Sequence, residues 1–116
     1  MGDENNISLA KSCKIIAYFT IVPLGTKSTS LGKYVATALA AIDKVKSLSY
    51  ELTPMGTTME ADSIAPIFEA VKVAHEALTA KGIFRIESTL IIDDRKDKPR
   101  TMKHKVNSVK KYLKQL

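Results

Sequence analysis

The sequence is poor in the residues that build disulfide, metal and nucleophile chemistry. Its 116 residues include one cysteine, two histidines and no tryptophan. Cys13 has no second cysteine for an intrachain disulfide, which favours a reducing compartment. With only Cys13, His75 and His104 available, a four-ligand zinc site cannot be assembled from cysteine and histidine. These absences exclude a disulfide-stapled domain and a zinc centre of that type.

Long hydrophobic runs are absent as well. No apolar stretch approaches the ~18 residues of a membrane span. Residues 1–6 are acidic and polar, which does not fit a secretory signal. We expect a polar leader over residues 1–13, a single domain over residues 14–116, and a cytoplasmic protein.

The net charge of +6 is concentrated at one end of the chain. Residues 95–116 hold nine basic residues and one acid, Asp97, giving +8, whereas residues 1–94 hold nine basic and eleven acidic residues, giving −2. A basic terminal segment is most often a solvated helix face. The paired stacking aromatics of RNA-binding sheets are also missing. Nucleic acid is therefore an unlikely partner on these grounds.

Residues 14–24 predict a first strand that is apolar on both faces. We expect Pro23 to end it, because proline has no ladder donor. One face requires a cover of helices, and the other requires a ligand or a partner subunit. One face carries Ile15, Ala17, Phe19 and Ile21. The other carries Ile16, Tyr18, Thr20 and Val22.

Apolar residues at steps of three and four predict three helices. Their expected N-caps are Ser30, Asp62 and Thr101, and Gly82 is expected to end the second helix. Their apolar stripes are Leu31, Val35, Ala38, Ile42 and Val45 in the first; Ile64, Ile67, Phe68, Val71, Ala74 and Leu78 in the second; and Met102, Val106, Val109 and Leu113 in the third. The third stripe is expected to pack on its own domain or on a neighbour.

A hairpin is predicted over residues 49–54 and 57–61, with Gly56 supplying a positive φ at its turn. Residues 83–92 predict the last strand, with Phe84, Ile86, Ser88, Leu90 and Ile92 on one side, followed by a charged loop at 93–99. The order β-α-β-β-α-β-α predicts an α+β ferredoxin-like domain, with two helices on one face of an antiparallel sheet and a C-terminal helix added. The uncovered face predicts a homo-oligomer.

The candidates for chemistry are few. His75, at the edge of the second helix's stripe, fits a partly buried structural histidine better than a base. Cys13 shows no sign of activation. Asp93, Asp94 and Asp97 could hold a cation, but the interleaved basic residues favour local ion pairs. No catalytic or metal-binding residue is therefore assigned.

Two segments combine threonine hydroxyls, glycine and an apolar residue beside proline, namely residues 20–26 and 53–60. That mixture is used by small-ligand pockets. It is also what well-formed turns with high strand propensity require. The residues alone leave both interpretations open and favour the turns.

Four segments in order, residues 19–26, 50–60, 74–77 and 92–98, resemble the small thiamine-binding-protein family of YkoF-like domains. The resemblance extends from about Ile15 to Leu113. It implies a ferredoxin-like domain that forms dimers and commonly tetramers. It also implies binding of thiamine, or of its hydroxymethylpyrimidine half, without catalysis and without a cofactor or metal.

The resemblance also implies a site at two places in the chain. The ligand-binding positions are Thr20, Pro23 and Leu24 at the end of the first strand, and Thr57, Thr58 and Glu60 in the hairpin. Ala61 stands where the family usually has glycine. Hydroxyls and a carboxylate suit an aminopyrimidine, and a cationic thiazolium suits Glu60 or the ring of Tyr18. The alternative is an interaction or regulatory assembly module with no small ligand.

Overall fold

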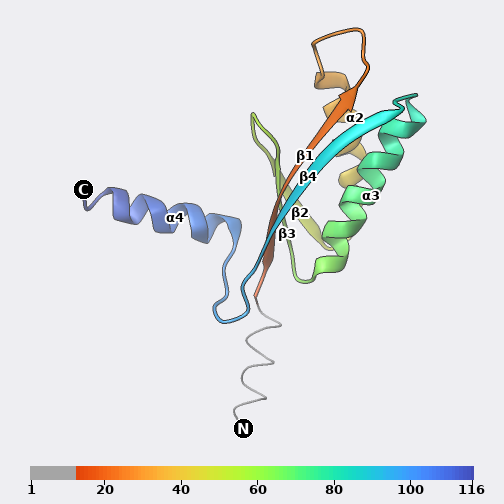
Figure 1. Cartoon of the computed structure of the whole chain (residues 1–116). Helices are drawn as coiled ribbons and strands as arrows, with labels where there is room; N and C mark the ends of the chain where they lie inside the picture. The colour runs from red at the N-terminus through yellow and green to blue at the C-terminus, as the bar shows by residue number, and fades with distance from the viewer. Residues whose placement is uncertain (1–12) are drawn as a thin grey trace.

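The computed structural model describes residues 13–116, so the predicted leader lies outside the described residues except for Cys13. Seven elements follow in order (Figure 1): β1 (Ile15–Leu24), α2 (Gly32–Ile42), β2 (Leu48–Leu52), β3 (Thr57–Ala61), α3 (Ile64–Ala80), β4 (Arg85–Asp94) and α4 (Met102–Leu113). The four strands form one antiparallel sheet in the order β2-β3-β1-β4. This confirms the predicted α+β ferredoxin-like fold.

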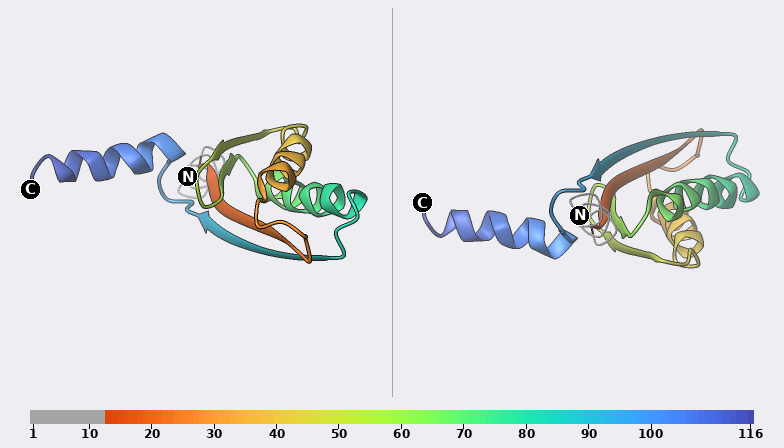
Figure 2. Two further views of the ribbon diagram at one scale, coloured as in Figure 1. Left: turned by 90° about the horizontal axis from the view of Figure 1, so that it is seen from above. Right: turned by 90° about the horizontal axis from the view of Figure 1, so that it is seen from below.

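The core lies between the sheet and two helices. Figure 2 shows α2 and α3 together on one side of the sheet. Phe19 and Met59 from the strands and Ile42 and Ile67 from the helices are almost completely buried there. Alternation along β1 places Ile15, Ala17 and Phe19 in this cluster, as predicted from the two-residue period.

The opposite face of the sheet has no helix over it. Tyr18 of β1 lies there between Thr58 of β3 and Ile91 of β4, because paired residues of an antiparallel sheet point to the same side. Ile91 is 63% exposed. We call this surface the open face; it is formed by Ile16, Tyr18, Thr20 and Val22 of β1, Thr58 and Glu60 of β3, and Glu87, Thr89, Ile91 and Asp93 of β4.

The prediction that Pro23 ends the first strand is wrong. β1 continues to Leu24, and Pro23 lies opposite Ile86 of β4. Beyond Phe19, β1 pairs only with β4, so its other edge is free. A proline is tolerated in a strand that has such an unpaired edge.

Two of the three predicted N-caps are also wrong. The N-cap of α2 is Leu31, because the helix begins at Gly32, and Ser30 lies one residue earlier, where its N–H donates to the Ser28 hydroxyl. The cap of α3 is Ser63, because Asp62 is ion-paired with Lys14. The third prediction is confirmed, and Thr101 caps α4 in a reciprocal capping box with His104.

The helix boundaries and stripes differ from prediction in detail. α2 ends at Ile42, so Val45 lies beyond it. In α3 the buried residues are Ile67, Ala70, Ala74 and Leu78, whereas Phe68 is 52% exposed. Gly82 ends α3 as predicted, at a φ of 86°. Its N–H bonds the Thr79 carbonyl and the Ile83 N–H bonds that of Leu78.

The last strand begins and ends two residues later than predicted. Ile83 lies in the turn that closes α3, where its N–H bonds the Leu78 carbonyl, and Phe84 is fully exposed. Asp93 and Asp94, predicted in the loop, extend β4 because they pair with Ile16 and Ile15 at the start of β1. Leu90 and Ile92 pack against the core as predicted.

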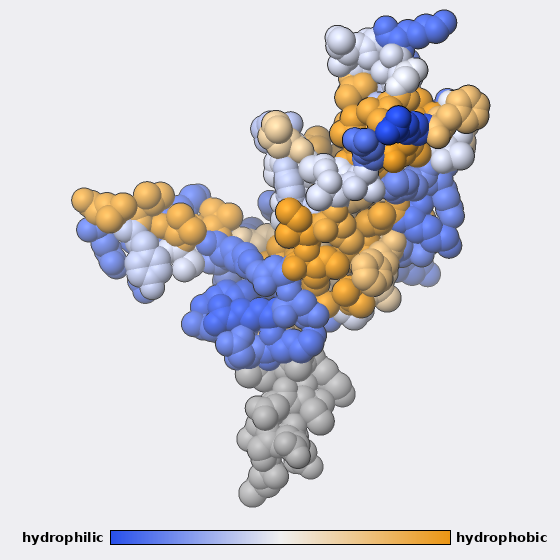
Figure 3. All heavy atoms as spheres, viewed as in Figure 1, coloured by the Kyte–Doolittle hydropathy of each residue, from blue (hydrophilic) through white to orange (hydrophobic). Residues whose placement is uncertain are grey.

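α4 projects away from the rest of the molecule (Figures 1 and 2). None of its residues is buried, and Val109 is 61% exposed, so the predicted packing on its own domain is wrong. The radius of gyration is 16.8 Å, against about 13 Å for a compact domain of this length. Figure 3 shows apolar side chains over the strands and along one side of α4. Packing on a neighbour stays a prediction.

Within residues 13–116, no helix is both long and apolar enough to cross a membrane.

The prediction of a positive φ at Gly56 is wrong, and the glycines with a positive φ are Gly25 and Gly82. Gly56 is needed because a side chain there would have no room. A Cβ at Gly56 would lie 2.6 Å from the ring of Tyr18. We therefore expect Gly56→Ala to displace that ring and to lower the free energy of unfolding by about 1–2 kcal/mol. Chemical denaturation measures the loss, and near-ultraviolet circular dichroism reports the tyrosine environment.

The matched control for this substitution is Gly32→Ala. A Cβ at Gly32 would have no atom within 4 Å, and this residue lies at the start of α2, where alanine suits a helix. Equal stability of the two variants would contradict the close approach of Gly56 to Tyr18.

Candidate functional site

A small cavity opens where β1 and β3 separate. Their pairing ends at Phe19 and Thr57, after which β3 turns back into the hairpin while β1 continues beside β4. Val35 of α2 closes the cavity from the helix side. Its volume is about 140 Å³. We call it the hairpin cavity; the lining residues are Phe19, Thr20, Ile21, Val22, Val35, Leu52, Thr53, Pro54, Met55, Gly56 and Thr57.

The threonine hydroxyls of the hairpin cavity have different tasks. The Thr53 hydroxyl donates to the Gly56 carbonyl at 2.8 Å and accepts from the Gly56 N–H at 3.1 Å, so it holds the turn. Thr57 is only 6% exposed. Neither Thr57 nor Thr20 uses its hydroxyl in a hydrogen bond to another residue in the range 13–116. Thr57 is paired with Phe19 and shares its inner face, whereas Thr20 alternates onto the open face, so only the Thr57 hydroxyl is on the side of the cavity that α2 covers and can bond a small polar molecule there.

The structure brings together some of the predicted site residues and separates others. Thr20 and Thr57 both line the hairpin cavity. Thr58 points to the open face, opposite Tyr18. Leu24 borders a different cavity, of about 370 Å³, beyond the end of β1. Pro23 lies in β1 between Thr20 and Leu24, opposite Ile86 of β4.

Glu60 lies near the opposite end of the sheet from the hairpin turn. It is on the open face opposite Ile16, and its Oε2 accepts a hydrogen bond of 2.8 Å from the Met102 N–H. The carboxylate therefore satisfies a free donor in the first turn of α4 and complements the positive end of the helix dipole. Sequence reasoning missed this role because the two residues are 42 positions apart.

A second cavity, of about 340 Å³, lies at the junction of α4 with the start of β1 and the end of β4. We call it the junction cavity; the residues that line it are Lys14, Ile16, Asp93, Arg95, Arg100, Lys105, Ser108 and Val109. The sequence signal for it was the basic segment 95–116, but which of its residues meet the sheet could not be read from the sequence.

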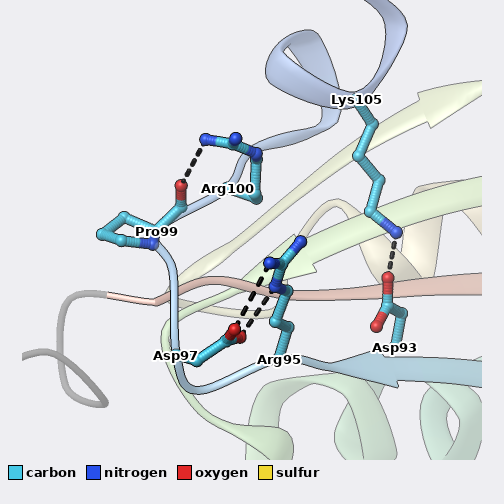
Figure 4. A network of polar contacts seen from close by, with 6 residues as sticks. All are labelled: Asp93, Arg95, Asp97, Pro99, Arg100 and Lys105. Carbon is cyan, nitrogen blue, oxygen red and sulfur yellow. Dashed lines mark hydrogen bonds and ion pairs between the residues drawn. The ribbon is translucent and has the colours of Figure 1, made fainter. Parts of the chain in front are cut away.

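Ion pairs surround the junction cavity (Figure 4). Arg95 binds Asp97 through two hydrogen bonds, of 2.7 and 3.3 Å, and this interaction lowers the pKa of the Asp97 carboxyl. Lys96 pairs with Asp94 at 2.7 Å, and Lys105 with Asp93. Local ion pairing is thereby confirmed for Asp94 and Asp97, whereas Asp93 pairs with Lys105 of α4, twelve residues away. No group of residues in the described part of the chain has the composition of a metal site.

His75 joins α3 to the sheet. Its Nε2 lies 2.7 Å from the Ser88 hydroxyl of β4, and the ring is partly buried. This contact fits the structural role that the sequence favoured for His75 over a role as a base.

Comparison with known proteins places these features in a family. Residues 17–110 match the family model described as thiamine-binding protein. A UPF0045 protein of Methanothermobacter thermautotrophicus is 48% identical over 99 residues, covering 85% of this chain and 99% of that protein.

Two solved structures share the fold. A hypothetical protein of Methanocaldococcus jannaschii has a TM-score of 0.74 and 36% identity, over 84% of this chain and 96% of that one. A protein of Thermotoga maritima, named as a candidate for thiamine biosynthesis or salvage, has a TM-score of 0.66 and 25% identity, over 83% and 98% of the two chains.

The contact between Glu60 and Met102 yields a test of how α4 is held. In Glu60→Ala the Met102 N–H loses its acceptor, and we expect its hydrogen exchange to accelerate roughly fivefold, as for the loss of about 1 kcal/mol. Exchange measured by nuclear magnetic resonance checks this. Glu51→Ala on β2 removes an exposed carboxylate of the same sheet and should leave Met102 unchanged. Equal exchange in both variants would mean that Glu60 does not hold the start of α4.

Proposed function

From the premise that this chain belongs to the thiamine-binding protein family, we propose that it binds thiamine or the hydroxymethylpyrimidine half of thiamine, as a homo-oligomer and without catalysing a reaction. One observation carries the proposal beyond the family match. The strand-end segment and the hairpin segment, distant in sequence, border one cavity, and Thr57 contributes an unbonded hydroxyl to it.

The size of the hairpin cavity favours the smaller ligand. Its volume of about 140 Å³ is below the ~300–1,000 Å³ of typical ligand pockets. A single aminopyrimidine ring suits this volume better than a two-ring molecule. A ring nitrogen can accept from the Thr57 hydroxyl, and the amino group can donate to that hydroxyl or to a backbone carbonyl.

Ligand binding is tested by thermal unfolding of the purified protein with thiamine, with its pyrimidine half and with its thiazole half. A ligand that binds the folded state raises the melting temperature by mass action. We expect a rise with the pyrimidine half and with thiamine, and none with the thiazole half. If none of the three ligands raises it, the assembly-module alternative is favoured.

Variants locate the binding site. Thr57→Val removes one hydroxyl with little change of shape, and calorimetry should show about three- to tenfold weaker binding of the pyrimidine. Thr79→Val, at an exposed position of α3 outside the hairpin cavity, is the control. Because Glu60 lies outside the hairpin cavity and accepts from the Met102 N–H, Glu60→Gln should leave the affinity unchanged, and a loss of about tenfold would return Glu60 to the site.

Self-association is supported by two uncovered apolar surfaces on one chain. The open face exposes Ile91, and α4 exposes Val106, Val109 and Leu113. Exposed apolar patches of this kind mark interfaces, and a second copy offers matching surfaces. We expect an assembly, most simply a dimer of dimers. The same observation supports the alternative in which assembly is the chain's whole task.

Light scattering at micromolar concentration tests the assembly. Ile91→Asp places a charge on the open face and should reduce the assembly's size, whereas Ala36→Asp on the outer side of α2 should not. Truncation after Pro99 should also reduce the size while leaving the domain folded, because no residue of α4 is buried. A monomeric wild-type protein would contradict the prediction.

A further inference from the structure

We propose that the junction cavity is a binding site for a phosphate group, carried by a small anion such as an organic phosphate. The inference does not depend on the proposed binding of thiamine or its pyrimidine half, because the junction cavity shares no lining residue with the hairpin cavity. Three segments form the site: the start of β1, the end of β4 with the loop after it, and α4 as far as Val109.

The charge of the lining is strongly positive. Four cations, Lys14, Arg95, Arg100 and Lys105, line the cavity with a single carboxylate, Asp93. Asp62 and Asp97, the carboxylates that pair with Lys14 and Arg95, are not among the lining residues. The hydrogen bond to Asp62, and to a smaller extent the charge of Glu60, raise the pKa of Lys14. The Glu60 carboxylate accepts a hydrogen bond from the Met102 N–H.

Arg100 is the residue left without an opposite charge. Its Nη1 donates at 3.2 Å to the Pro99 carbonyl, and it enters no ion pair within residues 13–116 (Figure 4). A planar guanidinium presents paired donors that match the oxygens of a phosphate. The site therefore has one arginine whose donors are not used by a carboxylate, beside three cations that strengthen the local field.

The remaining lining residues fit a phosphate carried by a small organic body. The Ser108 hydroxyl is a further donor, and Ile16 and Val109 supply apolar walls. The volume of about 340 Å³ falls within the range of small-ligand pockets. A bare thiazolium or other cation is repelled by this lining, so the junction cavity and the hairpin cavity select different ligands.

A bound phosphate would also hold α4. Lys105 and Ser108 belong to the helix, whereas Lys14 and Arg95 belong to the sheet side. An anion between them bridges the helix to the strands, where the present contacts include the Glu60–Met102 hydrogen bond and the Asp93–Lys105 ion pair. Occupancy of the site thereby controls the placement of the helix with the exposed apolar stripe.

The test measures the binding of inorganic phosphate and of pyrophosphate to the full chain by calorimetry in moderate salt. Arg100→Gln should weaken pyrophosphate binding at least about tenfold. Lys110→Gln, also on the segment 95–116 but outside the cavity, removes the same charge and should change binding by less than about twofold. Melting temperatures without ligand establish that both variants fold.

Three results would overturn the proposal. The first is no binding of either anion by the wild type at millimolar concentration. The second is an equal loss of binding in the two variants, which would mean diffuse attraction to a basic helix. The third is binding of a single-stranded oligoribonucleotide that both variants weaken equally, with a steep salt dependence, which would make α4 a nucleic-acid strip.

Discussion

The pairing of β1 with its two neighbours decides the rest of the structure. β1 is the central strand that is apolar on both faces, and it pairs with β4 along its whole length but with β3 only from Ile15 to Phe19. Its inner face anchors α2 and α3, and its outer face gives the open face. Because β3 stops pairing at Thr57, the hairpin cavity opens beside the free edge of β1.

The two ends of β1 thus serve two different cavities. Beside its C-terminal half, Thr20 and Thr57 border a small cavity whose lining residues are uncharged. At its start, Lys14 and Ile16 border a cationic cavity that α4 completes. Glu60 lies on the strand that joins these regions, but its carboxylate is directed to α4. A ligand at one end and an assembly contact at the other are compatible within a single sheet.

α4 shows how a helix can be well formed without being packed. Its capping box and its basic last turn stabilise the helix locally, yet its apolar side remains exposed. A helix of 12 residues is marginal in isolation, since most helical stability comes from tertiary packing. Its exposed stripe and the open face are the two apolar surfaces on which the proposed self-association rests.

The sequence by itself determined the order of elements, the inner face of β1, the end of α3 at Gly82 and the capping of α4 by Thr101, because each follows from a local period or a local backbone requirement.

Only the tertiary structure decided which predicted site residues meet. Thr20 and Thr57 come together, whereas Leu24 and Glu60 do not join them, since strand register places residues that are near in sequence at distant points of the sheet. It likewise decided that Pro23 remains in the strand, that Asp62 pairs with Lys14 rather than capping a helix, and that Gly56 makes room for Tyr18. These outcomes depend on contacts between segments far apart in the chain, which no local pattern encodes.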